Sequence, residues 1–482
     1  MRYVSSRGRE EVSSSQAILQ GIAKDGGLFC PLEIPKATFL DQLATLSYRE
    51  IAVRVISLWF DDFSTQEIEE IVYQGYRQAN FPGGFVGLRE IHDGWLLNLW
   101  HGPTFAFKDM ALSLFSLFQK KAKEKCAETR RTVILTATSG DTGSAVLSGF
   151  AKDPETEVYV FYPQGKVSDF QEAQMLSFAS KTKHVIAVEG NFDDCQTLIK
   201  KAFSEIHLDN TILSSANSIN LARIVPQIVY YFAAYGRLLA EGVIKQGEEV
   251  TFTVPTGNFG DILAGYYAKR MGLPIHKLVV ASNENAVLTS FFQTGLYNRK
   301  RPFHQTASPS MDILISSNLE RLLFETSNHD FSRVQKWMSD LSWKGEYLVE
   351  DDILQALKTF EAYWAKEHEA AKTIRDVHDQ DQWLVEAHTA VGVACMRKHV
   401  EQTQDSHIQI VLSTASPIKF APFVLASLGE EIPRDANLQI ERLRHGYQVF
   451  DARAKLFLYQ TNPRTVWPLE EALSNLRRHL DE

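Results

Sequence analysis

The residue with the clearest chemical potential is Lys108, which lies in the segment His-Gly-Pro-Thr-Phe-Ala-Phe-Lys-Asp at residues 101–109. A long apolar stretch, residues 110–118, follows it directly. Burial of an ammonium group lowers its pKa, and the neutral amine is then a nucleophile toward aldehydes. Lys108 is therefore a candidate Schiff-base lysine. On this segment alone a simpler interpretation is favoured, namely a lysine whose stem covers the core while its ammonium stays in water.

A second candidate for chemistry is the loop Gly-Asn-Phe-Gly-Asp at residues 257–261, which follows an apolar run and precedes a helical pattern. Its glycines allow close backbone approach, and free N–H groups at a helix start favour an anion such as phosphate. A β–α turn without a ligand explains the loop equally well. The loop matches neither GxGxxG nor GxxxxGK[ST], which argues against a dinucleotide site or a P-loop. We expect Asp261 to stabilise the helix dipole rather than to contact phosphate.

Two further loops carry polar groups suited to anions. The loop Ser-Gly-Asp-Thr-Gly at residues 139–143 offers hydroxyl and N–H groups to a carboxylate. Considered alone, it is better explained as a helix cap that needs no ligand. The segment 215–223 precedes another helix and ends at Arg223, whose guanidinium can bind a phosphate or carboxylate through two hydrogen bonds. The alternative there is a surface arginine on a helix capped by Asn and Ser.

The elements that must position these loops share one design, in which an apolar strand is followed by small residues and then by a helix. Such alternation predicts a mostly parallel sheet covered by helices, with ligands beyond the carboxyl ends of the strands. The three units of this kind have strands at 133–138, 250–254 and 408–412, and further strands are expected at 157–162, 185–188 and 277–281.

A chain of 482 residues exceeds the size of one compact core, so two or three domains are expected. We predict a mainly helical N-terminal domain at 1–82, a smaller α/β domain with Lys108 at 83–236, and a larger α/β domain at 237–482. Residues 334–370 are predicted to form a helical insertion in the larger domain. One face of this insertion is expected to contribute core residues, namely Ile353, Leu357, Phe360 and Trp364.

Composition and charge exclude several classes of function. The net charge of -9, without a basic block, argues against a nucleic-acid surface. The four cysteines are far apart and form no CxxC pair, so neither a disulfide framework nor a metal site is expected, and a reduced, cytoplasmic protein is the default. We find no secretory signal at the N-terminus and no apolar run long enough for a membrane span.

Together, these segments resemble the threonine synthase family of the longer, bacterial and fungal type. That family belongs to fold type II of the pyridoxal-phosphate (PLP) enzymes, whose α/β architecture is similar to the β subunit of tryptophan synthase. The resemblance implies two α/β domains with mostly parallel sheets and a mainly helical N-terminal domain. The segments that carry it are 3–8, 23–29, 101–109, 139–145, 215–223, 255–261, 308–313, 316–321, 388–392 and 413–415.

The resemblance also implies roles for individual residues. Lys108 would be the lysine that forms the Schiff base with pyridoxal 5'-phosphate, and Thr414 would lie near the pyridine nitrogen. The cofactor site would comprise Lys108, Gly257, Asn258, Phe259, Gly260, Asp261 and Thr414, with the phosphate on the backbone from Gly257 to Gly260. The substrate carboxylate would be held by Ser139, Gly140, Asp141, Thr142 and Gly143. Candidates for the leaving phosphate are Asn217, Asn220 and Arg223, with Ser310 as a weaker one.

The implied reaction converts O-phospho-L-homoserine and water into L-threonine and phosphate, with this small molecule as partner and a monomer or homodimer as assembly. Two motifs depart from the family pattern. In one, Ser416 and Ile418 replace the usual His and Ala; in the other, Glu386-Ala387 replaces the usual Asp-Pro. These departures leave open a PLP-dependent phospho-lyase that releases 2-oxobutyrate. A catalytically silent cofactor-binding paralogue is a further alternative, against which the presence of Lys108 and the 257–261 loop argues.

Overall fold

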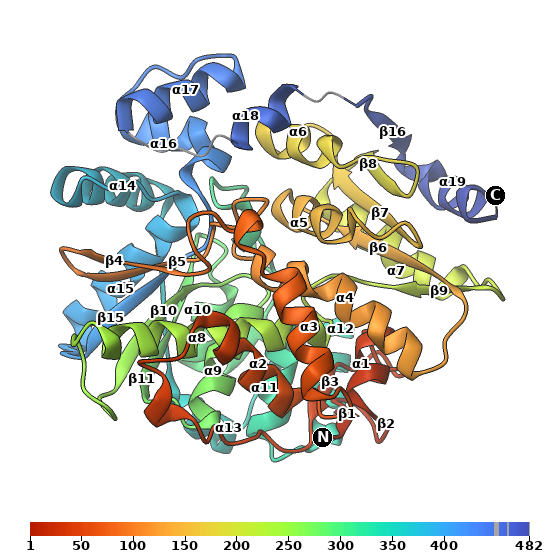
Figure 1. Ribbon diagram of the computed structural model, residues 1–482, viewed down its shortest axis with the longest axis horizontal. Coiled ribbons are helices and arrows are strands. Elements are labelled where there is room, and N and C mark those ends of the chain that lie inside the picture. The colour runs from red at the N-terminus through yellow and green to blue at the C-terminus, as the bar shows by residue number, and fades with distance from the viewer. Residues whose placement is uncertain (448–452, 460–461, 482) are drawn as a thin grey trace.

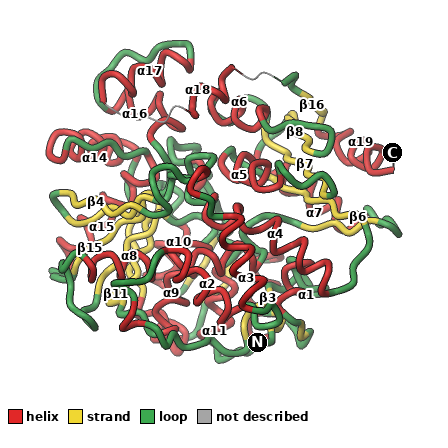
Figure 2. The backbone as a smooth tube through the Cα atoms, in the orientation of Figure 1, coloured by secondary structure: helices red, strands yellow, loops and turns green. Residues whose placement is uncertain are grey.

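The computed structural model describes residues 1–447, 453–459 and 462–481, and these form two sheets with helices around each (Figure 1). Figure 2 shows the strands as two separate groups. The larger sheet is parallel except for its last pair, which is a hairpin. Its strands, in spatial order, are β14 (Phe360–Trp364), β11 (Ile275–Ser282), β10 (Val250–Pro255), β15 (Ile408–Ser413), β5 (Gly94–Asn98) and β4 (Gly87–Ile91).

The smaller sheet is parallel throughout. Its strands, in spatial order, are β16 (Thr465–Pro468), β8 (Lys183–Glu189), β7 (Thr156–Pro163), β6 (Arg131–Ala137) and β9 (Thr211–Ser214). The central strands β6 and β10 are buried along almost their whole length, including Thr251 and Thr253 of β10, because helices cover both faces of each sheet. All six predicted strands are confirmed within two or three residues at each end.

Helices enclose both sheets and join them. Those against the larger sheet are α9 (Gly260–Met271), α10 (Val287–Thr294) and α15 (Ala387–Thr403), with α14 (Glu367–Asp381) packed on α15. Those around the smaller sheet are α5 (Asp141–Phe150), α6 (Asp169–Ser177), α7 (Phe192–Glu205) and α19 (Leu469–Asp481). The remaining helices of the C-terminal half are α11 (Leu319–Thr326), α12 (Phe331–Trp343), α13 (Asp351–Ala356), α16 (Ala421–Ser427), α17 (Ala436–Tyr447) and α18 (Arg453–Tyr459).

The N-terminal region is helical but also contains a small antiparallel sheet. That sheet comprises β1 (Tyr3–Ser5), β2 (Glu11–Val12) and β3 (Phe29–Pro31). Elsewhere, β12 (Leu296–Asn298) and β13 (Glu346–Leu348), which are far apart along the chain, pair as a separate two-stranded antiparallel sheet. The helices of the N-terminal region are α1 (Ser14–Gln20), α2 (Tyr48–Trp59) and α3 (Thr65–Gly75), each of which begins at a serine capping box. They pack on α4 (Asp109–Lys125) and on α8 (Leu221–Ala240), an almost fully buried helix.

The predicted helical face in the 334–370 insertion is wrong in its second half. Ile353 and Leu357 lie in helical turns, but Phe360 and Trp364 lie on strand β14, which pairs in parallel with β11. Phe360 is buried as expected, whereas Trp364 is 38% exposed. The sequence Phe-Glu-Ala-Tyr-Trp fits a strand as well as a helix, and pairing with an existing strand decides between them.

Sheet membership does not follow the predicted domain boundaries at 82/83 and 236/237. Strands β4 and β5, from the segment expected in the smaller domain, complete the larger sheet. Strand β16 and helix α19, from the end of the chain, pack on the smaller sheet. None of the helices in the described part of the chain combines the length and apolar character needed to cross a bilayer.

Candidate active site

The predicted loops meet around one cavity of about 580 Å³. The loops after β6 and β10 and the end of β15 all contribute to its wall. Strands β10 and β15 are neighbours in the larger sheet, so their carboxyl ends lie at the same edge, whereas the loop after β6 comes from the smaller sheet. The predicted site residues that line it are Lys108, Ser139, Asp141, Thr142, Asn217, Arg223, Gly257, Asn258, Phe259, Gly260, Asp261 and Thr414.

Lys108 lies at the start of helix α4 and is only 9% exposed. Its Nζ lies 3.4 Å from Asp141 Oδ2, 3.4 Å from Ser310 Oγ and 4.8 Å from the centre of the Phe107 ring. Burial lowers the pKa of Lys108, Asp141 raises it, and the positive charges of Lys419 and Arg223 lower it further. The lowered pKa is what a lysine nucleophile or base requires.

Asp141 is held between two buried lysines. Its Oδ2 faces Lys108, and its Oδ1 accepts a hydrogen bond from Gln171 at 2.9 Å and forms an ion pair with Lys419 Nζ at 3.0 Å. Burial opposes ionisation of Asp141, but the positive charges of Lys419 and Lys108 keep its pKa well below the usual range. Lys419 is fully buried and also donates to Thr104 O at 2.8 Å. The sequence analysis missed Lys419, although it lies three residues after the Ser416 departure from the family pattern.

The loop at 257–261 has the features of an anion cradle. Among the described residues, none accepts a hydrogen bond from the N–H groups of Gly257, Asn258, Phe259 or Gly260. The carbonyl groups are engaged instead, since Gly257 O accepts from Ser316 Oγ and Asn258 O accepts from the side chain and N–H of Asn318. Free N–H groups at the start of α9 suit a phosphate.

The glycine at position 257 is required by packing as well as by ligand access. A Cβ there would lie 2.3 Å from the carbonyl oxygen of Ser310, which belongs to the backbone and cannot easily move. At Gly260 a Cβ would lie 3.3 Å from the nearest atom, on the flexible Ile224 side chain. Phe259 adopts a left-handed conformation with φ of 61°, and its ring stacks on Phe292. This strained turn is stabilised by the surrounding aromatic packing.

Asp261 lies in the first turn of α9, as expected, but it is buried beneath the cradle. Its Oδ1 accepts hydrogen bonds from the hydroxyl groups of Tyr230 and Tyr231, while its Oδ2 has no partner among the described residues. Burial raises the pKa of Asp261 to about 7, although the two tyrosines and Lys108 lower it. A carboxyl that is about half neutral at pH 7 is more compatible with a neighbouring phosphate than a fully ionised one.

We predict that the Asp261→Asn variant removes a pH dependence of stability. Between pH of about 4 and the folded pKa of about 7, the folded protein binds more protons at Asp261 than the unfolded chain does. The free energy of unfolding of the wild type therefore falls with rising pH, relative to the variant, by up to about 1.4 kcal/mol per pH unit. Urea denaturation from pH 4 to 8 measures the difference. Asp41→Asn, at an exposed site, is the control; parallel profiles for wild type and Asp261→Asn would refute the prediction.

Thr414 belongs to a buried network that the sequence analysis only partly identified. Its hydroxyl donates to Glu386 Oε1 at 3.5 Å, and Glu386 also accepts from Thr389 and from His388 Nδ1, the latter at 2.6 Å. His388 Nε2 in turn accepts from the N–H of Ser310 at 3.1 Å. These partners place the His388 proton on Nδ1. His388 and Ser310 both line the cavity, and His388 is a site candidate that its own sequence motif could have indicated.

The two departures from the family pattern lie behind the cavity wall. Neither Ser416 nor Glu386 lines the cavity. Ser416 is buried, and its hydroxyl caps a short helical turn by accepting from Ile418 N–H. Glu386 caps α15 and orients His388. Any effect of these residues on the reaction must therefore pass through their neighbours.

Three predicted substrate residues do not line the cavity, namely Gly140, Gly143 and Asn220. The two glycines permit close packing. A Cβ at Gly140 would lie 2.4 Å from the Gln171 side chain, and a Cβ at Gly143 would lie 2.6 Å from the Met175 side chain. Asn220 is fully buried, caps α8 and donates to Ile18 O at 2.9 Å. Helix capping accounts for Asn220 without a ligand.

Arg223 and Asn217 supply polar groups without protein partners inside the cavity wall. Arg223 is 2% exposed and donates through Nη1 to Ala216 O at 2.7 Å, but its Nε has no partner among the described residues. Burial lowers the pKa of Arg223 to about 10, so the group remains charged at neutral pH. Asn217 Oδ1 is likewise unpartnered. A buried arginine that lacks a carboxylate suits an anionic ligand.

A buried lysine of lowered pKa, a cradle of free N–H groups and an arginine at the carboxyl ends of parallel strands define a PLP-dependent enzyme of fold type II. The sequence agrees, because residues 88–414 match the family model described as "Pyridoxal-phosphate dependent enzyme". Residues 2–76 match "Threonine synthase N terminus", and residues 389–452 match "Threonine synthase, C-terminal". The chain belongs to the threonine synthase family.

Individual relatives support this assignment along the whole chain. The threonine synthase of Schizosaccharomyces pombe is 38% identical over 91% of this chain and 91% of its own length. That of Pseudomonas aeruginosa is 38% identical over 91% and 93%. The solved PLP-bound threonine synthase of Brucella melitensis is 37% identical, with a TM-score of 0.87 and 99% of both chains covered. The expected fold class is confirmed.

Proposed function

We propose that the cavity around Lys108 is the active site of a PLP-dependent threonine synthase reaction. As a member of its family, the chain converts O-phospho-L-homoserine and water into L-threonine and phosphate. The observation that carries the assignment to this cavity is the pairing of a lysine of lowered pKa with a loop of unengaged N–H groups. Among the structural observations, none favours the 2-oxobutyrate lyase or the silent paralogue.

The residues present fit pyridoxal 5'-phosphate. The N–H groups of Gly257, Asn258, Phe259 and Gly260 offer the phosphate four donors that no described residue occupies. Lys108 supplies the amine for the cofactor aldehyde, and Thr414 supplies a hydroxyl for the ring nitrogen. Glu386 beside that hydroxyl fixes its orientation. When bound, the cofactor supplies the electron sink that stabilises negative charge on the substrate carbon atoms.

Lys108 is the general base of the proposed mechanism. Its lowered pKa lets a neutral Nζ remove the proton from the substrate Cα, and Asp141 and Ser310 hold that nitrogen in place. Asp141 is engaged by Lys108, Lys419 and Gln171, so we assign the substrate carboxylate to the Ser139 and Thr142 hydroxyl and N–H groups. The N–H groups of Gly140 and Gly143 are not included, because both donate to Thr138 Oγ1.

Arg223 and Asn217 hold the leaving phosphate in this proposal. Both line the cavity, Arg223 Nε is a donor without a partner among the described residues, and Arg223 brings the positive charge that a departing dianion requires. Asn220 is not retained in this role because its polar groups are occupied. We propose that the chain is cytoplasmic, monomeric or homodimeric, and acts on this small molecule without nucleic-acid or membrane partners.

The test of function is the product formed from O-phospho-L-homoserine in ¹⁸O-labelled water. We expect L-threonine and phosphate in equal amounts, with the solvent label in the threonine hydroxyl group, because water adds at Cβ after phosphate leaves. Mass spectrometry of the products measures both outcomes. If 2-oxobutyrate were the main product with little threonine, the lyase would replace the synthase. If no product formed from cofactor-loaded protein, the silent paralogue would be correct.

A further inference from the structure

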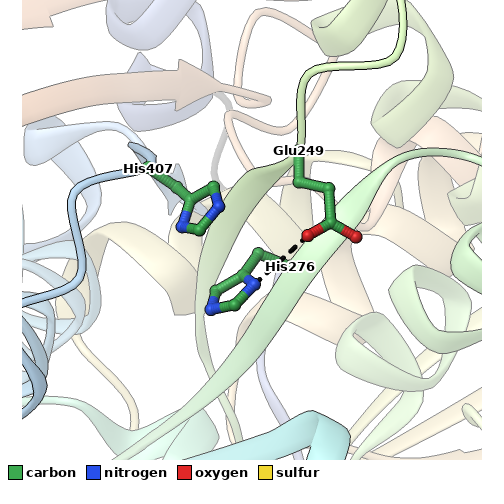
Figure 3. A group of neighbouring side chains, drawn as sticks. All are labelled: Glu249, His276 and His407. Atoms are coloured by element: carbon green, nitrogen blue, oxygen red, sulfur yellow. Dashed lines mark hydrogen bonds and ion pairs between the residues drawn. The ribbon is translucent and has the colours of Figure 1, made fainter.

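We propose a binding site for a divalent transition-metal ion at the N-terminal ends of the strands of the larger sheet, opposite the active site. Its ligands are Glu249, His276 and His407, and we take Zn²⁺ as the ion that this donor set fits. The ligand atoms of the three side chains lie within 4.8 Å of one another (Figure 3). Imidazole and carboxylate together form a frequent ligand set for zinc.

The parallel sheet itself brings the three residues together. Glu249 directly precedes β10, His276 is the second residue of β11, and His407 directly precedes β15. Strand β10 pairs with both others, so that Val250 lies opposite Ile275 on one side and Ile408 on the other. The cluster is therefore at the N-terminal ends of the strands. With strands of six residues, it lies about 20 Å from the active-site loops.

The side chains already face one another. His276 Nδ1 lies 3.3 Å from Glu249 Oε2, and the His276 and His407 rings stack with centroids 3.9 Å apart. A tetrahedral zinc site needs donor atoms about 3.3 Å apart, given Zn–N distances of about 2.0–2.1 Å. The donors must therefore close by at most about 1.5 Å. The three side chains are 34–47% exposed, so rotation about their side-chain bonds is available.

Asp405 orients the His407 ring so that its Nε2 can bind a metal. Its Oδ1 lies 2.6 Å from His407 Nδ1, while its Oδ2 accepts from Thr251 and Gln409 and lies 3.0 Å from His399 Nε2. A carboxylate that accepts from Nδ1 leaves the lone pair of Nε2 free for a metal, and such partners fix the ligating ring in many metal sites.

Charges around the site favour a cation. Glu249 and Asp405 bring two carboxylates, while Lys269 donates to the carbonyl groups of Ile275 and His276, and Lys277 pairs with Glu361. Three protein ligands leave one tetrahedral position to water. The ion would join the starts of three adjacent strands. No local sequence pattern indicates this site, because its residues are far apart along the chain and only the sheet brings them together.

Calorimetric titration of Zn²⁺ into the chelator-treated holoenzyme tests the proposal. We expect one ion per chain, and a loss of affinity of at least about tenfold in each of His276→Ala, His407→Ala and Glu249→Gln. His445→Ala is the matched control, since His445 also pairs with a carboxylate, Glu441, but within the described residues belongs to no group of three metal-ligating side chains. Its affinity for Zn²⁺ should equal that of the wild type.

Substitution with Co²⁺ gives a second measurement, because visible absorption bands of a tetrahedral ion should appear in the wild type and the control only. Should either histidine variant fail to fold, the exposed Glu249→Gln variant decides the question. Absence of stoichiometric binding to the wild type would overturn the proposal. Binding that the three substitutions leave unchanged would overturn it equally.

Discussion

The Lys108→Ala variant is expected to lose more than about 10³-fold of kcat, because it removes both the nucleophile for the cofactor aldehyde and the base at the substrate Cα. It should also lose the covalent link to the cofactor that borohydride traps in the wild type. The fold should survive, since Asp141 keeps its contacts with Lys419 and Gln171. Steady-state kinetics and mass spectrometry of the reduced protein measure the two effects.

The matched control for this prediction is Lys120→Ala, which removes an exposed lysine of the same helix. Its kinetics and its trapped cofactor should equal those of the wild type. Turnover of a folded Lys108→Ala protein within tenfold of the wild-type rate would remove Lys108 from the mechanism.

The Lys419→Met variant should show a double effect on stability and on pH dependence. Loss of one partner from a buried ion pair costs about 3–5 kcal/mol, because it leaves Asp141 with less compensation. The charge of Lys419 also lowers the pKa of Lys108, so its removal raises that pKa. Since the base must be neutral, the ascending limb of the kcat profile should move to higher pH.

A second buried lysine, Lys183, provides the control that separates the effect on stability from the effect on pH dependence. Lys183 is 2% exposed and donates to the carbonyl groups of Asp153 and Thr156, away from the cavity. Lys183→Met should therefore destabilise the protein without any shift of the kcat profile. Denaturation midpoints and pH–rate profiles of both variants provide the comparison. A Lys419→Met profile that coincides with the wild type would show that Lys419 has a structural role alone.

Local patterns predicted six of the eleven strands of the two large sheets, together with the cavity-lining loops. The strands β6, β10 and β15 are apolar runs followed by small residues, and the parallel sheets then bring their carboxyl ends together. The family resemblance supplied what the pattern left open, namely which of the loops meets Lys108. Strand β14 was missed because a short aromatic run has no unambiguous period.

Other parts of the site depend on contacts between distant segments, which no local pattern contains. Lys419 reaches Asp141 only because the turn after β15 packs against α6, where Gln171 and Gln174 lie. Asn220 and Asn217 are three residues apart, yet one caps α8 and the other faces the cavity. The orientation of such side chains follows from the packing of the helix that carries them.

The exchange of strands between the two sheets has a consequence for how the chain is made. During synthesis on the ribosome, β5 can pair with β15, Trp95 opposite Ile410, only after β15 has been made. In the same way, β8 can pair with β16, Ile186 opposite Thr465, only after β16 has been made. Neither sheet is complete until the C-terminal segment has emerged. Such a high contact order predicts slow folding, with exposed strand edges during synthesis and a need for chaperones at that stage.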